Sequence, residues 1–162
     1  MTKSAAEAIA KGLHIPFQIA QLHSALSTQA KAIISRHGDL NLAQWRIVRL
    51  VALDIANTTT AVRKGAGIDK SQFSKMLGVL EDKGYLKLRP FEEDKRQHLI
   101  ELTEKGRTSH DRLGPVLEAR QEHLVSALTA DEQATVLKAI KLLSEAAQKT
   151  DFPDPYVIPE DE

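Results

Sequence analysis

The sequence predicts a mainly α-helical fold with one small β-hairpin, an α+β arrangement. Apolar residues recur at helical spacing along most of the chain, and helix-capping patterns separate the segments. Strand-like alternation is confined to residues 84–89 and 97–102. The chain has 162 residues, 42% of them hydrophobic, so it can bury a core of about one domain.

The first third of the chain predicts three helices. A short helix opens at the capping-box pattern Ser4–Glu7 and ends at Gly12. A long helix begins at Pro16, a residue that suits the first turn, and runs to about Arg36. Asn41 caps a third helix, on which four apolar residues share a face: Trp45, Val48, Ala52 and Ile55.

The next segment predicts two helices joined by a turn. The first is brief, Ala61–Ala66, and the turn 67–69 follows it. Asp69 is a good N-cap for the second helix, and Gly84 is a good residue to end it. Four apolar side chains lie on one face of this second helix: Phe73, Met76, Leu77 and Leu80. The opposite face carries Ser71, Lys75, Gly78 and Asp82, flanked by Gln72 and Ser74.

The two strand-like runs are separated by the seven residues 90–96, which predicts a hairpin with a long loop. A long helix then runs from Thr103 to about Leu128, and Pro115 predicts a kink near residues 111–114. The capping box Thr129–Glu132 opens a last helix. Two interpretations stay open for the acidic, proline-containing tail 150–162: an arm lying on the body or a partner, or disorder.

The charges are balanced overall but unevenly distributed. The 22 basic and 22 acidic residues give a formal net charge of zero. Residues 1–60 carry 6 basic and 3 acidic side chains, residues 61–107 carry 11 and 8, and residues 108–162 carry 5 and 11. Positive charge therefore gathers near the two helices and the hairpin, which mildly favours a nucleic-acid partner.

Several classes of site are disfavoured. The chain has no cysteine, so disulfides, thiolate nucleophiles and thiol redox switches are excluded. Its six histidines show no metal-binding spacing such as HExxH, and no P-loop, GxGxxG or nucleophile elbow occurs. We therefore expect neither an enzyme nor a cofactor. No apolar run approaches the ~20 residues that span a bilayer, and no signal-peptide core is present, so we expect a cytoplasmic protein without membrane contact.

The order helix, turn, helix, hairpin is typical of a winged helix-turn-helix. Four motifs in this order resemble the signature of the MarR family of transcriptional regulators: Asp69–Ser71, Leu80–Leu86, Asp94–Arg96 and Leu102–Gly106. Residues 44–46, which lie upstream of these motifs, add to the resemblance. The resemblance implies dimerisation helices at 1–40 and 108–149, a DNA-binding domain at 41–107 and the tail 150–162. This sequence departs from the family at Arg63, where alanine is usual, and at Ala66, where a larger apolar residue is usual.

The second helix and the hairpin supply the candidate DNA-binding residues. Gln and Lys can hydrogen-bond base edges, Lys and Ser can also hold phosphates, and the resemblance implies an arginine in the minor groove, oriented by an aspartate. The candidates are Lys70, Ser71, Gln72, Ser74, Lys75, Arg89, Asp94 and Arg96, with Lys64 as a further phosphate contact. The alternatives are a solvated helix face, a surface ion pair between Asp94 and Arg96, and plain solvation of Arg89 and Lys64.

The family resemblance also implies a homodimer on a pseudo-palindromic operator and a repressor released by a small aromatic or carboxylate effector. The candidate effector residues are Phe17, His23, Trp45, Arg49 and His110. A tryptophan in the core and ordinary hydrogen-bonded histidines are the alternative for this set. Two other functions stay open: a winged helix that binds a protein instead of DNA, and a metal-responsive regulator.

Overall fold

The computed structural model describes residues 14–152, which form two compact units that meet between Ala119 and Arg120. The first unit contains α2 (Ile15–His37), α3 (Leu42–Ala52), α4 (Thr59–Ala66), α5 (Lys70–Asp82), β1 (Leu86–Pro90) and β2 (His98–Leu102). Helix α6 (Glu104–Val125) starts in the first unit, and α7 (Ala130–Ala146) belongs to the second. The predicted helix at 4–12 and the tail from 153 onward lie outside the described residues.

Helix α3 begins at a capping box in which Asn41 and Gln44 exchange side-chain to backbone hydrogen bonds. Trp45 and Val48 are buried on it, as the spacing predicts. The placement of Ile55 on the same face is wrong, because the helix ends at Ala52 and Ile55 is 66% exposed. The physical reason is Asp54, whose φ of +52° is left-handed and cannot continue a right-handed helix.

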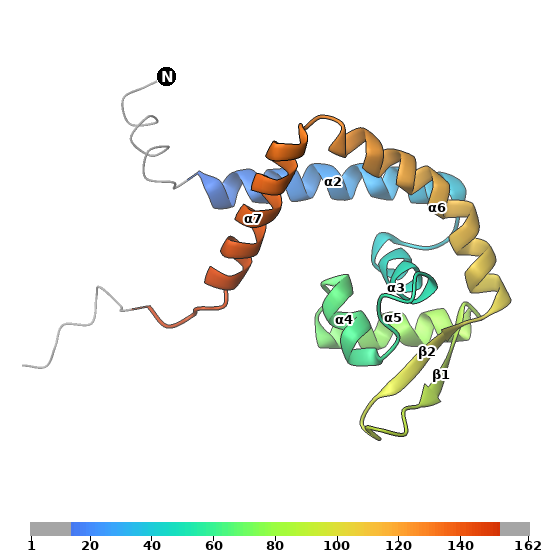
Figure 1. The fold of residues 1–162 in the computed structure, drawn as a ribbon. Helices are drawn as coiled ribbons and strands as arrows, with labels where there is room; N and C mark the ends of the chain where they lie inside the picture. Colours follow the sequence, from blue (N-terminus) through green and yellow to red (C-terminus); the bar gives the residue numbers. More distant parts are fainter. Residues whose placement is uncertain (1–13, 153–162) are drawn as a thin grey trace, which may run out of the picture. The chain divides into compact units, whose positions relative to one another are not determined.

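Helices α4 and α5 form the predicted helix-turn-helix. Gly67, with φ +66°, ends α4 in the left-handed conformation that favours glycine. The Asp69 carboxylate then accepts the backbone N–H of Gln72 at 2.9 Å and caps α5. Figure 1 shows α3, α4 and α5 gathered beside the hairpin. Their core contains fully buried side chains from five elements, namely Ile47, Val48, Val62, Leu80, Leu86 and Ile100.

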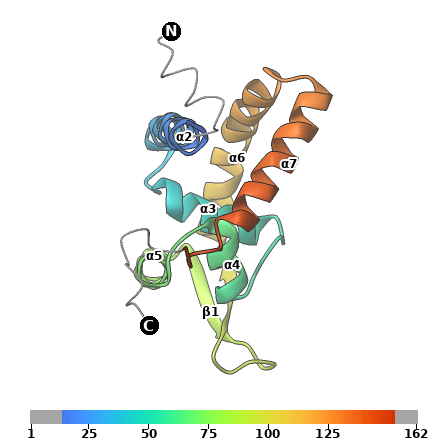
Figure 2. The ribbon, with the colours of Figure 1, turned by 90° about the vertical axis from the view of Figure 1, so that its left-hand side faces the viewer.

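Strands β1 and β2 pair antiparallel, with Leu86 opposite Leu102 and Pro90 opposite His98. The hairpin is attached to the start of α4, because the Ile100 N–H donates to the Asn57 carbonyl at 2.7 Å and Thr58 bridges to Leu99. In Figure 2, α5 is seen nearly along its axis and the hairpin extends beyond α4 and α5. The hairpin tip therefore projects while its base is fixed.

Helix α6 is joined closely to the turn between α5 and β1, at the start of the hairpin. The Thr103 hydroxyl donates to the Gly84 carbonyl at 2.6 Å, and the Lys105 ammonium donates to the Lys83 carbonyl at 2.7 Å. The helix is continuous through Pro115 and ends at Val125, three residues before the predicted end at Leu128. These hydrogen bonds fix the start of α6 relative to the start of the hairpin.

Two helices expose large apolar side chains. On α2 these are Ile15, Phe17, Ile19 and Leu22. On α7, which opens at the predicted capping box of Thr129 and Glu132, they are Val136, Leu137, Ile140, Leu142 and Leu143. None of the described helices has the length and apolar character needed to cross a membrane.

Candidate nucleic-acid interface

The front half of α5 presents a polar face to solvent. Phe73 and Leu77 are 4% and 6% exposed, so they fix which side of α5 faces the core. The helical repeat then turns the intervening residues outward. All five predicted contacts on this helix are exposed: Lys70, Ser71, Gln72, Ser74 and Lys75. Because the Ser74 hydroxyl donates to the Lys70 carbonyl at 3.1 Å, its oxygen faces any ligand as an acceptor.

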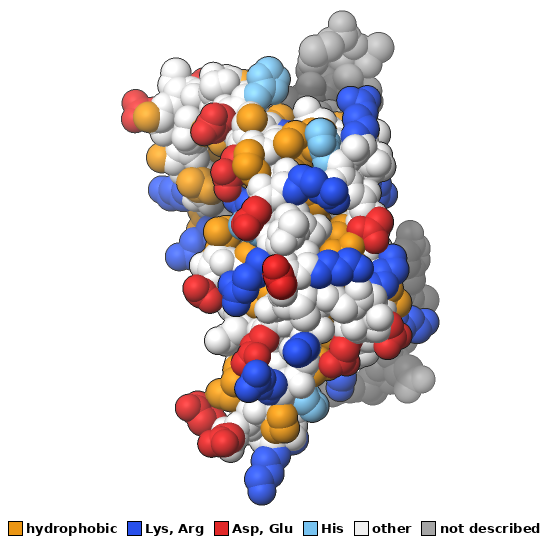
Figure 3. Space-filling model, turned by 90° about the vertical axis from the view of Figure 1, so that its right-hand side faces the viewer, with side chains coloured by type: hydrophobic (Ala, Val, Ile, Leu, Met, Phe, Trp, Pro, Cys, Tyr) orange, Lys and Arg blue, Asp and Glu red, His pale blue; other side chains and the backbone are white. Residues whose placement is uncertain are grey.

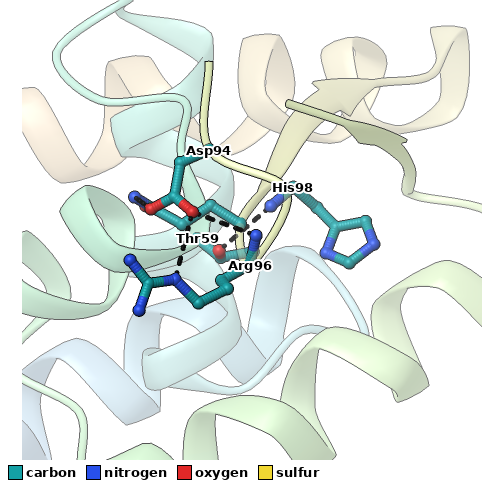
Figure 4. Close-up of polar contacts among 5 residues, drawn as sticks. Thr59, Asp94, Arg96 and His98 are labelled. Atoms are coloured by element: carbon teal, nitrogen blue, oxygen red, sulfur yellow. Dashed lines mark hydrogen bonds and ion pairs between the residues drawn. The ribbon is translucent and has the colours of Figure 1, made fainter. Parts of the chain in front are cut away.

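The hairpin loop holds an arginine near its C-terminal end, at Arg96. The Asp94 carboxylate accepts the Arg96 backbone N–H at 3.0 Å and the Arg96 Nε–H at 3.4 Å (Figure 4). The Gln97 amide donates to the other Asp94 oxygen at 3.0 Å. These hydrogen bonds, that of Gln97 foremost, hold the pKa of Asp94 below its ordinary value. The Arg96 side chain is 93% exposed, so its aspartate orients it without burying it.

A groove of about 610 Å³ lies between α4, α5 and the hairpin loop. Its walls include Lys70, Ser74, Asp94 and Arg96, four of the predicted residues. They also include Thr59, Thr60, Arg63 and His98, which the sequence analysis did not assign. The sequence signal that could have identified two of them is the spacing of Thr59 and Arg63, which are one turn apart and so lie on the same face of α4.

The base of this groove is held by the contact between α4 and β2. The His98 backbone N–H donates to the Thr59 hydroxyl oxygen at 3.3 Å. In Figure 4 the Arg96 guanidinium and the His98 imidazole extend to opposite sides of Thr59. The two side chains are therefore directed apart, and a ligand beside Arg96 is separated from the His98 ring.

The two predicted phosphate contacts, Arg89 and Lys64, differ in their surroundings. Arg89 is paired across the hairpin with Glu101, at 2.8 Å between Nε and the carboxylate oxygen. This pairing competes with phosphate binding by Arg89, although the Arg89 side chain is 65% exposed and the Glu101 side chain 45%. Lys64 is exposed in the last turn of α4.

Surface charge on the face shown in Figure 3 is mixed. Basic and acidic side chains are interspersed there, and no continuous patch of one sign covers the face. This agrees with the zero formal net charge. Attraction of a polyanion must therefore depend on the local arrangement of side chains rather than on a global field.

Three of the five predicted effector residues are together. The Trp45 and His110 rings stack with centroids 5.5 Å apart, and the Arg49 guanidinium lies 5.8 Å from the Trp45 ring. Arg49 also pairs with Glu118 at 3.2 Å. Phe17 and His23 are exposed on α2 and take part in none of these contacts.

The same cluster contains buried polar atoms without a partner. Arg49 Nη1 and His110 Nε2 are both buried and make no hydrogen bond with a described residue. Such atoms are costly unless a ligand or water satisfies them. Trp45 is itself 4% exposed, so it belongs to the core as well as to the cluster.

No cluster of His, Asp and Glu side chains within residues 14–152 is arranged to hold a metal ion. A polar contact that no local sequence pattern reveals joins the turn between α5 and β1 to the loop before α3: the buried Tyr85 donates its hydroxyl hydrogen bond to Asp39. Burial, followed by this bond, raises the pKa of Tyr85 to about 12. The bond in turn is the main cause that lowers the pKa of Asp39.

Comparison with known proteins places this fold. A MarR/EmrR family transcriptional regulator from Acinetobacter sp. ADP1 has a TM-score of 0.75 at 22% identity, over 85% of this chain and 96% of that chain. A MarR family transcriptional regulator from Streptomyces coelicolor, solved with DNA, has a TM-score of 0.74 at 18% identity, over 92% and 95%. NadR in complex with 4-hydroxyphenylacetate has a TM-score of 0.66 at 26% identity, over 85% and 94%.

No curated protein matches the chain in a sequence search. The model of the MarR family matches residues 38–97, the segment that contains α3, α4, α5 and the hairpin up to Gln97. The solved structures share the winged helix-turn-helix arrangement over most of the chain. The family model and the fold agree: residues 38–97 match the MarR family, and the chain has the fold of solved MarR-family regulators.

Proposed function

We propose that this protein is a transcriptional regulator that binds double-stranded DNA in a sequence-specific manner. The observation that carries the proposal is the exposed polar face on the front half of α5, beside a loop whose arginine is exposed and oriented by Asp94. Gln72 can read adenine and Lys75 can read guanine or hold a phosphate, while Arg96 suits a narrow minor groove. A regulator from Streptomyces coelicolor with the same fold was solved with DNA.

The protein is proposed to act as a homodimer. The exposed apolar side chains on α2 and on α7 leave each helix with an uncovered face, which a second copy can bury. In a two-fold dimer the two α5 helices enter successive major grooves about 34 Å apart, so the operator is pseudo-palindromic. Dimerisation then sets the spacing of the two α5 helices that contact the DNA.

We further propose that a small aromatic or carboxylate compound controls DNA binding and that the protein is a repressor released by it. Trp45 supplies an aromatic surface, Arg49 a cation with an unpartnered nitrogen and His110 a second unpartnered nitrogen. This set suits a planar acid. NadR, a fold relative, was solved with 4-hydroxyphenylacetate, an acid of this kind.

Two other functions compete with this proposal. A winged helix can bind a protein through its hairpin, and the residues of α5 are then a solvated surface. A metal-responsive regulator needs a cluster of metal ligands. Within residues 14–152, no group of three or more His, Asp or Glu side chains is placed to hold a metal ion. The DNA-binding proposal is the one that accounts for the α5 face and the loop arginine together.

The deciding experiment is selection of bound duplexes from a random DNA library. We expect enrichment of a two-fold motif, to which Lys75→Ala and Arg96→Ala bind more weakly than the parent. Lys138→Ala, which removes an exposed charge from α7, is the matched control and should bind like the parent. Failure to enrich any motif, or equal binding by all four proteins, would favour the protein-binding alternative.

A further inference from the structure

The helix before the DNA-reading helix also contributes a polar face to the groove. Thr59, Thr60 and Arg63 lie within about one third of the circumference of α4, because they are three and four residues apart. All three line the groove of about 610 Å³ between α4, α5 and the hairpin loop. Neither the sequence motifs nor the predicted contacts include them.

Arg63 is held in place but not neutralised. Its Nη1 donates to the Ile68 carbonyl oxygen at 3.4 Å, in the turn that joins α4 to α5. A guanidinium has five N–H donors, and no carboxylate of a described residue pairs with this one. The side chain is partly buried, so part of the ordering entropy that a ligand contact would require has already been lost. Most of its hydrogen-bonding capacity is therefore still available.

The groove is positive because basic side chains outnumber acidic ones in its lining. Among the residues that line it, Arg63, Lys70 and Arg96 are basic and Asp94 alone is acidic. Both carboxylate oxygens of Asp94 are engaged within the hairpin loop, by Arg96 and Gln97. Arg63 and Lys70 are consequently left without a counter-charge in the groove.

A neutral donor lies beside these cations. The Thr59 hydroxyl oxygen accepts the His98 backbone N–H, so its own hydrogen remains free to donate. Basic groups together with a free hydroxyl match a singly charged oxyanion. In a helix-turn-helix the first helix crosses the DNA backbone while the second enters the major groove. The oxyanion available at α4 is then a backbone phosphate.

We propose that this groove is a phosphate-binding site for the DNA backbone, with Arg63 as its main ligand and Thr59 beside it. The inference rests on the proposed DNA-binding function and adds a third element, α4, to α5 and the hairpin loop. Because a phosphate contact carries no base information, Arg63 contributes affinity and register rather than sequence preference.

The test measures DNA affinity by fluorescence anisotropy over a series of KCl concentrations, with Arg63→Ala, Arg63→Lys and the control Lys138→Ala. Two labelled duplexes are used, one recovered by the library selection and one scrambled. We expect Arg63→Ala to weaken binding to both duplexes by the same factor, roughly tenfold for each bound copy, because each copy loses one charge-assisted hydrogen bond. Its salt dependence should be shallower by about 0.9 for each bound copy, and Arg63→Lys should retain the parent slope.

Other results would overturn the inference. If Arg63→Ala lowers the melting temperature but leaves the salt slope unchanged, Arg63 only fixes the turn through Ile68. If it weakens binding to the selected duplex alone, Arg63 reads bases. A parent protein that binds neither duplex would refute the proposed function, whereas a parent that binds while Arg63→Ala binds equally well would refute this inference alone.

Discussion

The backbone of Gly106 lies against the carbonyl group of Tyr85, so closely that a Cβ atom on Gly106 would stand 2.1 Å from the carbonyl oxygen. This is the point where the start of α6 meets the start of the hairpin. The same carbonyl accepts the Thr103 backbone N–H at 3.1 Å, so it cannot move away without losing a hydrogen bond. Position 106 therefore requires glycine because of contact and not because of its backbone angles.

We predict that Gly106→Ala lowers the free energy of unfolding by about 2–3 kcal/mol, the cost of overpacking against a fixed backbone. Gly78→Ala is the matched control, because nothing lies within 4 Å of a Cβ built there and Gly78 is inside α5. Alanine at 78 should stabilise by about 0.5–1 kcal/mol. Urea denaturation measures both, and a Gly106→Ala protein as stable as the parent would show that this junction can open.

The Tyr85 to Asp39 bond predicts how stability changes with pH. Tyr85 has a raised pKa of about 12, so its contribution is complete below the ordinary value of 10.0 and is lost as the pH rises from 10.0 through about 12. Asp39 has a lowered pKa, so its contribution is present above 3.8 and is lost as the pH falls through its folded-state value.

Tyr85→Phe should remove the alkaline loss and weaken the acid loss, and it should cost about 1 kcal/mol at neutral pH. The check is the urea midpoint of the parent and the variant across both pH ranges. An alkaline loss of the same size in Tyr85→Phe would mean that other groups produce it and that this bond does not.

Orientation of Arg96 by Asp94 predicts an effect opposite to simple electrostatics. Removing a negative charge near DNA should strengthen binding, yet Asp94→Ala is expected to weaken it several-fold, because Arg96 and Gln97 lose the carboxylate that holds them. Glu93→Ala removes a neighbouring exposed charge and should bind DNA slightly more tightly. Anisotropy titrations compare the two, and tighter binding by both variants would show that Asp94 acts only through its charge.

The cluster of Trp45, Arg49 and His110 predicts a response to aromatic acids. A thermal-shift titration with 4-hydroxyphenylacetate, and with a panel of phenols and aromatic acids, should raise the melting temperature of the parent. Trp45→Ala and Arg49→Ala should lose most of the shift, whereas His23→Ala, at an exposed position on α2, should retain it. A compound that stabilises Trp45→Ala and Arg49→Ala as much as the parent would place its binding site elsewhere.

Local patterns in the sequence determined the helices, their caps and the outward face of α5. Asp69, Asn41 and Thr129 cap their helices as predicted, because capping depends on residues only three positions apart. The same reasoning orients Ser71, Gln72, Ser74 and Lys75 outward, since burial of Phe73 and Leu77 fixes the rotation of the helix. It was wrong at Ile55, where a left-handed residue ended α3 before the apolar pattern did.

Tertiary structure alone decided which residues from distant segments meet. The groove joins Thr59 and Arg63 on α4 to Arg96 in the hairpin loop, the Tyr85 hydroxyl reaches Asp39, and Arg89 is paired with Glu101. Spacing along one helix cannot reveal such contacts, because they depend on how the elements pack and on the register of the hairpin. The sequence therefore determined the side chains that we propose for DNA binding, and the packing of α4, α5 and the hairpin decided which of them share a groove.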